Sequence, residues 1–175
     1  MNRMTICKVL VFLTIMMTFA VPAITAQETD TTTNNDKKFG ISVALQTEQL
    51  DITFPIWPGS SIVIIPSISV VTVSDAATDF GFGLGFRYNL NTTEAVPYIG
   101  VRFAALTLIP KNGDAMTDLV FGLFAGGEYF FNDHFSVSVE AQLNYAHSDE
   151  FSFRFNNPDG TNVNTATVAL ATFYF

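Results

Sequence analysis

The run His147-Ser148-Asp149-Glu150 brings together the residue types of a hydrolytic site, namely a base, a nucleophile and acids. In such a site the serine and the histidine must face the same way, because the base accepts the nucleophile's proton. Here the two residues are adjacent, and neighbours on an extended strand point to opposite faces. The spacing argues against enzyme activity, and we predict no catalytic residue.

Two other features could be taken for ligand sites. His134 follows Asp133 between two apolar runs, where a solvated turn residue is expected in preference to a metal ligand. The glycines of residues 80–86 (FGFGLGF) recur at every second position, whereas a phosphate-binding loop has G-x-G-x-x-G spacing before a helix. We therefore expect neither a metal ion nor a cofactor.

Four charged residues share a face with small and polar residues: Arg87, Arg102, Glu128 and Glu140. A charge held away from water is costly unless it is paired, and two cations beside two anions on neighbouring strands can pair. We predict that they form an ion-pair network inside the molecule. Its role would be to pack a narrow interior, and the alternative is a gated pore or a proton path.

The elements that would position these residues are strands, because apolar residues recur at every second position from Phe39 onward. The clearest case is FGFGLGFRYNL, in which large apolar side chains alternate with glycine, arginine and asparagine. The pattern predicts eight strands, at residues 39–46, 50–56, 62–73, 80–90, 97–109, 119–131, 135–145 and 161–175.

Tilted strands of about 10 residues are long enough to cross a bilayer, and an even number of strands returns the chain to the side on which it starts. Turns are expected at 58–61, 91–96 and 132–134, and loops at 47–49, 74–79, 111–117 and 148–160. The predicted fold is all-β, an eight-stranded antiparallel up-and-down transmembrane β-barrel.

Alternation alone does not say which face meets lipid, since a soluble lipocalin-like ligand-binding barrel alternates too. A soluble surface carries about 25–35% charged residues, whereas the predicted strands carry almost none. Aromatic residues also gather at one end of the apolar face, as an interface girdle would: Tyr88, Tyr129, Phe131, Phe135, Phe173 and Phe175. We expect the apolar face to contact lipid.

Three stretches carry a resemblance to a known family: PYIGVRFAAL, FGLFAGGEYFFNDHFSVSVEAQLNYAHS and the terminal ATFYF. They resemble the small bacterial outer-membrane β-barrel domain, OmpA-like and OmpX-like in architecture. The resemblance implies a Gram-negative outer membrane, contact with its lipid and lipopolysaccharide, and assembly by machinery that reads the C-terminal strand with Phe175. Some barrels of this kind are lipid A deacylases or acyltransferases.

The N-terminal residues agree with export. Residues 1–26 begin with Arg3 and Lys8, continue through an apolar run and reach Ala26, as a secretory signal peptide does. Residues 27–38 are polar and are expected to form a disordered periplasmic leader, before a barrel domain at 39–175. Beyond residue 26 there is no cysteine, and six basic against sixteen acidic residues give that part a net charge of 6 − 16 = −10, which argues against nucleic acid as a partner.

We therefore expect a non-enzymatic integral outer-membrane protein with a structural or adhesion-like role through its external loops. The contact residues would be Phe151, Phe153 and Phe155, on a strand hairpin that protrudes above the membrane. The partner outside the cell stays unknown. The alternatives are a lipid-modifying enzyme, a narrow channel and the soluble barrel.

Overall fold

The computed structural model describes residues 39–46, 50–73, 77–91 and 94–175. The expected signal peptide, the leader, the loop at 47–49 and part of the loop at 74–79 lie outside these residues. Within the described ranges, no helix is long and apolar enough to cross a bilayer.

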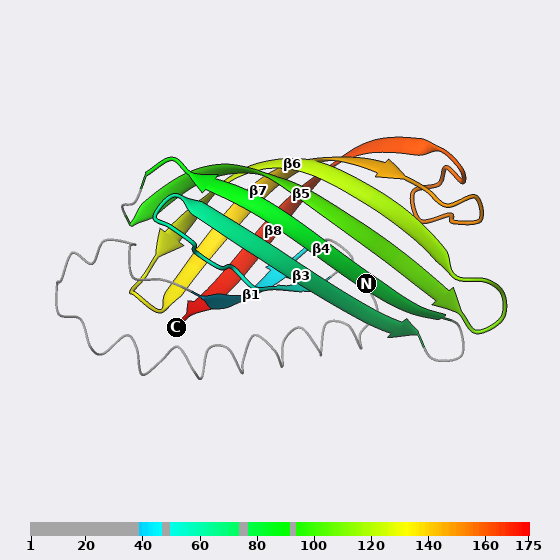
Figure 1. Ribbon diagram of the computed structural model, residues 1–175, viewed down its shortest axis with the longest axis horizontal. Helices are drawn as coiled ribbons and strands as arrows, with labels where there is room; N and C mark the ends of the chain where they lie inside the picture. The colour runs from blue at the N-terminus through cyan, green and yellow to red at the C-terminus, as the bar shows by residue number, and fades with distance from the viewer. Residues whose placement is uncertain (1–38, 47–49, 74–76, 92–93) are drawn as a thin grey trace. The chain divides into compact units, whose positions relative to one another are not determined.

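Eight strands follow one another along the chain: β1 (Gly40–Leu45), β2 (Leu50–Thr53), β3 (Ile62–Val73), β4 (Ala77–Asn89), β5 (Ala95–Pro110), β6 (Met116–Phe130), β7 (Phe135–His147) and β8 (Thr161–Tyr174). Each pairs with the next in antiparallel fashion, and β8 pairs with β1, so the sheet closes into a barrel. Figure 1 shows the long strands β3 to β8 running at a slant to the long axis of the view, with the C-terminus beside β1. The predicted all-β eight-stranded barrel is confirmed.

Burial follows the alternation of the sequence. Along β7, exposed and buried residues alternate at almost every position, and β6 behaves in the same way. The outward residues are the large apolar ones, such as Phe82, Leu123 and Val139, which are all about half exposed or more. The inward residues of β7 are all small or polar. Their pattern places the oily face outside, as expected for a barrel that contacts lipid.

Gly100 makes room for the ring of Phe124 in the narrow interior of the barrel. A Cβ atom added to Gly100, on β5, would overlap the ring of Phe124 and the backbone oxygen of Phe86. The absence of a side chain at Gly100 therefore makes room for Phe124, which lies on the neighbouring strand and is paired with Gly100 across the sheet.

The structure corrects several predicted boundaries. β2 ends at Thr53 rather than Ile56, because Pro55 has no N–H to donate, and beyond it Ile56 makes only isolated bridges to Phe39 and Ile64. β4 begins at residue 77 and β6 at residue 116, so the loops before them are shorter than predicted. The expected protruding hairpin is wrong, because β7 ends at His147 and residues 148–160 form turns.

The barrel has two distinct ends. The turn end carries the connections at 58–61 and 131–134, and there the backbone of Phe175 donates to the oxygen of Phe39 over 3.0 Å. The loop end carries the connections at 111–115 and 148–160. The inward polar residues divide between a group near the turn end and a group at the loop end.

Candidate functional site

A buried ion pair lies inside the barrel near the turn end. Arg87 of β4 donates from Nη2 to Oε2 of Glu128 on β6 over 2.7 Å, and the Glu128 side chain is fully buried. The other carboxylate oxygen of Glu128 accepts from the hydroxyls of Ser136, at 2.5 Å, and Tyr174, at 2.7 Å. Three donors therefore satisfy one carboxylate, which is the condition for keeping a charge in a low-dielectric interior.

Aromatic rings enclose the cationic partner. The guanidinium of Arg87 lies 4.5 Å from the ring centroid of Tyr98 and 5.5 Å from that of Trp57. Trp57 belongs to an apolar cluster that also contains Val63, Val96, Phe130 and Tyr174. All of these side chains are buried, and together they fill the interior at the turn end.

The other two predicted charges lie farther along the interior and do not touch each other directly. Arg102 donates to Oε1 of Gln142 over 2.7 Å, and Gln142 donates from Nε2 to Glu140 over 3.1 Å. Tyr98 also donates to Glu140, over 3.4 Å. The structure thus joins Arg87 to Glu128 as an ion pair, but separates Arg102 from Glu140 by a neutral amide.

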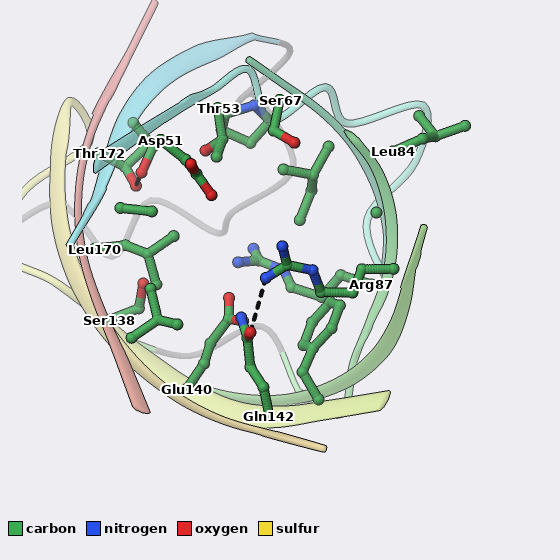
Figure 2. Close-up of a pocket in the computed structure, with 18 of the residues that line it drawn as sticks. Asp51, Thr53, Ser67, Leu84, Arg87, Ser138, Glu140, Gln142, Leu170 and Thr172 are labelled. Carbon is green, nitrogen blue, oxygen red and sulfur yellow. Dashed lines mark hydrogen bonds between the residues drawn. The ribbon is translucent and has the colours of Figure 1, made fainter. Parts of the chain in front are cut away.

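A small cavity of about 60 Å³ lies between these groups and the opposite wall. Figure 2 shows Glu140 and Gln142 pointing into it from one side, with Asp51 and Thr53 on the other. Its remaining polar lining includes Ser67, Ser138 and Thr172, whereas Leu84 points away from it. A cavity of this volume holds about two water molecules, so the interior is packed rather than open.

A second polar group ties the loop at 148–160 to the barrel wall. Asp118, a buried residue near the start of β6, accepts from the backbone N–H of Asp149, the hydroxyl of Ser152 and Nε of Arg154, over 2.8 to 3.0 Å. Arg154 also forms an ion pair with Asp79 of β4 at 2.7 Å. Burial alone would lower the pKa of Arg154, but the hydrogen bonds and charges of Asp79 and Asp118 outweigh it and raise that pKa.

The three predicted loop aromatics have different surroundings. Phe151 and Phe153 are 63% and 75% exposed. Phe155 is half-buried and packs against the apolar cluster of Leu106, Val120 and Ala146 inside the loop end. Phe155 is therefore less accessible than the other two rings, and its role as a surface contact stays a prediction.

His147 and Ser148, the potential base and nucleophile of a hydrolase, point to opposite faces of the barrel wall. His147, the last residue of β7, is exposed on the outer face, whereas Ser148 is buried. Asp149 accepts from the backbone N–H groups of Thr117 and Phe151 and so acts as a loop cap. His134 lies in the turn and contacts the backbone oxygen of Tyr174 through Nδ1, at 3.1 Å. In the described ranges, no three His, Cys, Asp or Glu residues come together as a metal site.

The six aromatic residues predicted as a girdle lie at the turn end. Phe131 has ring contacts with Tyr129 and Phe135, at centroid distances of 5.1 and 5.7 Å. Phe173 contacts Phe175 at 5.4 Å, and Tyr88 is exposed on β4. Tyr88, Phe131 and Phe175 are more than half exposed and Tyr129 is 48% exposed, which is how aromatic side chains at a membrane interface are displayed.

Several inward residues were not predicted as part of the site. Tyr98, Gln142 and Tyr174 supply hydrogen bonds to the two carboxylates, and Asp51 and Asp118 add two buried acids. The alternation itself could have found Asp51, since it lies between the apolar residues Leu50 and Ile52 in the sequence. The link from Asp118 to a loop more than 30 residues away has no signal in the sequence.

The comparisons with known proteins agree with this geometry. Residues 25–172 match the family described as outer membrane protein beta-barrel domain. Among solved structures, the N-terminal β-barrel domain of Pseudomonas aeruginosa OprF is similar, with a TM-score of 0.56 and 12% identity over 78% of this chain and 95% of that one. Neisserial surface protein A (NspA) is similar with a TM-score of 0.54 and 14% identity, over 78% and 93%.

No curated protein matches the chain. The two structural likenesses, at such low identity, concern the fold alone. The family match covers most of the sequence, including every strand of the barrel except the last residues of β8. This chain belongs to the outer membrane protein beta-barrel domain family.

Proposed function

We propose that this protein has a non-enzymatic, structural and surface-interaction role in the outer membrane, exerted through the loop at 148–160. Bacterial barrels of this class place short turns in the periplasm and longer loops outside the cell. On that rule the loop end faces outward, and the girdle of the turn end lies at the periplasmic interface. The family itself implies the outer membrane.

The observation that carries the proposal is the way in which the loop divides its side chains. Ser152 and Arg154 point to the barrel and bind Asp118, while Phe151 and Phe153 are left exposed. Exposure of a phenylalanine ring to water does not stabilise the protein, so exposed rings can mark an interaction site. The anchors of the loop hold these two rings in one place. A preorganised aromatic pair loses little conformational entropy on binding, which favours a contact role.

The surroundings of the pair indicate the chemistry of the partner. Glu150 and Asp159 are exposed in the same loop, and Asp114 is exposed in the neighbouring one. The loop's cation, Arg154, is already engaged by two carboxylates. A partner surface that offers an apolar pocket with basic groups around it would be complementary to this arrangement.

Neither the channel nor the enzyme is favoured by the described residues. The interior holds an apolar cluster near each end, with the Arg87–Glu128 pair and a cavity of about 60 Å³ between them. A hydrolase would need His147 and Ser148 on one face, but one is exposed and the other buried. These observations support a packed, non-enzymatic barrel.

The test replaces both exposed rings, as Phe151→Ala together with Phe153→Ala, in cells that display the protein. We expect the variant to assemble normally and to lose adhesion to host cells, matrix proteins or abiotic surfaces. The matched control is Phe131→Ala, which removes an equally exposed ring from the turn end. Unchanged adhesion after the double substitution, or after deletion of residues 151–157, would refute the role of the loop.

Two further partners follow from the same reading. We propose that outer-membrane lipid and lipopolysaccharide cover the outward apolar face, and that the barrel assembly machinery recognises β8 with Phe175, whose ring is 65% exposed. Replacement of Phe175 by serine is expected to slow insertion without changing the stability of barrels that have been inserted. Equal insertion rates of the variant and the parent protein in reconstituted assembly would count against the second proposal.

A further inference from the structure

The outer wall of the barrel, which the proposed function assigns to lipid and lipopolysaccharide, contains a hollow on its β4 to β7 side. It has a volume of about 590 Å³ and is open to the outside, within the range of about 300–1,000 Å³ typical of small-molecule sites. Its lining comes from four neighbouring strands, β4 to β7, and includes Phe82, Ala105, Leu119 and His147.

The pairing of the strands explains why the wall is hollowed here. Phe82, Ala105, Leu119 and His147 are paired directly across β4, β5, β6 and β7, so they form one row on the outer face. Ala105 is the one small side chain in that row, between a phenylalanine and a leucine. The missing side-chain volume at Ala105 therefore forms the floor of the hollow.

The next row toward the turn end closes the hollow on that side. It consists of Leu84, Phe103, Phe121 and Tyr145, which are again paired across the four strands. The rings of Phe103 and Phe121 contact each other at a centroid distance of 5.1 Å. Two contacting aromatic rings thus form one wall of the hollow.

The row toward the loop end begins with Phe80 on β4 and continues with two polar residues on β5 and β6. Thr107 of β5 and Thr117 of β6 are hydrogen-bonded to each other through their hydroxyls at 3.0 Å, and one of the two hydroxyls keeps a proton to donate. His147 lies at the end of the adjacent β7 and is exposed. An apolar hollow is therefore bordered by hydroxyl and imidazole groups on the side that faces the cell exterior.

We infer that this hollow binds one acyl chain of an outer-leaflet glycolipid, whose sugar hydroxyl and amide groups meet Thr107, Thr117 and His147. The hollow is continuous with the outward apolar wall, and Leu119 lies only three residues from the loop-end start of β6, which is the outer-leaflet side in the proposed orientation. An acyl chain is the occupant that such a wall meets. The site rests on the proposed orientation and deepens the proposed lipid contact of the outward face, and it is independent of the role of the loop at 148–160.

The charges near the rim decide the class of head group. Asp149 accepts from the backbone N–H of Thr117, and Glu150 is exposed next to it in the chain. These carboxylates disfavour a phosphate placed directly at the rim, because like charges repel. Neutral hydroxyl and amide groups of an acylated sugar do not suffer this repulsion, and they can pair with the threonine hydroxyls and the imidazole.

The experiment is native mass spectrometry of the protein extracted from outer membranes in a mild detergent. We expect the parent protein to retain one glycolipid. Ala105→Phe fills the floor of the hollow and is expected to abolish retention, and Ala105→Leu to reduce it. The matched control is Ala141→Phe, the same change at an exposed outward position of β7 outside the hollow, and it is expected to retain the lipid.

Combined replacement of the rim, Thr107→Val with His147→Ala, is expected to lower glycolipid retention without filling the hollow. The proposal is overturned if the parent protein retains no lipid, if it retains a phospholipid, or if Ala105→Phe and Ala141→Phe release lipid equally. Migration on a gel before and after boiling verifies that each variant is folded. Adhesion of the Ala105→Phe variant should equal that of the parent, which separates this site from the loop at 148–160.

Discussion

Replacing Arg87 by methionine tests the energetics of the barrel interior. The substitution leaves the carboxylate of Glu128 fully buried without its cation, although Ser136 and Tyr174 still donate to it. Removal of one partner of a buried pair costs about 3–5 kcal/mol. The contacts of the guanidinium with the rings of Tyr98 and Trp57 are lost as well, so we expect a cost in the upper half of that range.

A second substitution shows whether the stranded charge is the cause. With Glu128→Gln in the Arg87→Met background, no charge is left, and the amide oxygen can still accept from the hydroxyls of Ser136 and Tyr174. We expect the double variant to be destabilised by only about 1–2 kcal/mol, roughly the value of lost hydrogen bonds. The single variant Arg102→Met is the control, since Arg102 bonds to neutral Gln142, and its cost should be about 1 kcal/mol.

The measurement is reversible urea unfolding of the barrel in lipid vesicles, followed by tryptophan fluorescence. Trp57 is the sole tryptophan of the chain and is buried beside Arg87, so its emission reports on this region alone. Unfolding midpoints and slopes give the free energy of unfolding for each variant. The reasoning is refuted if Arg87→Met costs less than about 1 kcal/mol, or if the double variant is less stable than the single one.

Three other predictions follow from the same structure. Gly100→Ala should destabilise the barrel by about 1–3 kcal/mol, since the new methyl group would overlap the ring of Phe124, whereas Gly127→Ala meets nothing within 4 Å and should be neutral in the same urea assay. Asp118→Ala removes the acceptor that anchors the loop at 148–160. Proteases added to intact cells should therefore cut this loop faster than they cut it in the parent protein or in the control Asp114→Ala, whose site is exposed. Equal cleavage rates would contradict the anchoring. In planar bilayers the parent protein should show no steady open channel, because both apolar clusters and the Arg87–Glu128 pair occupy the interior, and a stable ohmic conductance would disprove this packing.

The fold could be predicted because the alternation is local and nearly unbroken. In residues 80–90 the side-chain types alone separate the outward face from the inward one, and the pairing of β4 with β3 and β5 keeps that separation. Where the alternation fails to fix the structure, another local rule intervenes. Pro55 cannot donate a hydrogen bond, so β2 stops early although the apolar pattern continues to Ile56.

The site was predictable only in part, because partner choice depends on register and on distant contacts. The inward direction of Arg87, Arg102, Glu128 and Glu140 followed from the pattern, but the interposition of Gln142 between Arg102 and Glu140 did not. In residues 151–155 the alternation is real, yet it arises from Ser152 and Arg154 binding Asp118, and not from a strand. A pattern of period two shows which side chains share a side and leaves open what lies on that side.

The unequal lengths of the strand pairings make the barrel mechanically uneven. Among the described residues, fourteen pairs join β5 to β6, but only four join β1 to β2, two join β2 to β3, and six join β1 to β8. The barrel thus consists of a stiff sector from β3 to β8 and a weakly paired sector formed by β1 and β2. Amide protons should exchange first along β1 and β2. These strands would be the last to pair during insertion and the first to separate under mechanical force.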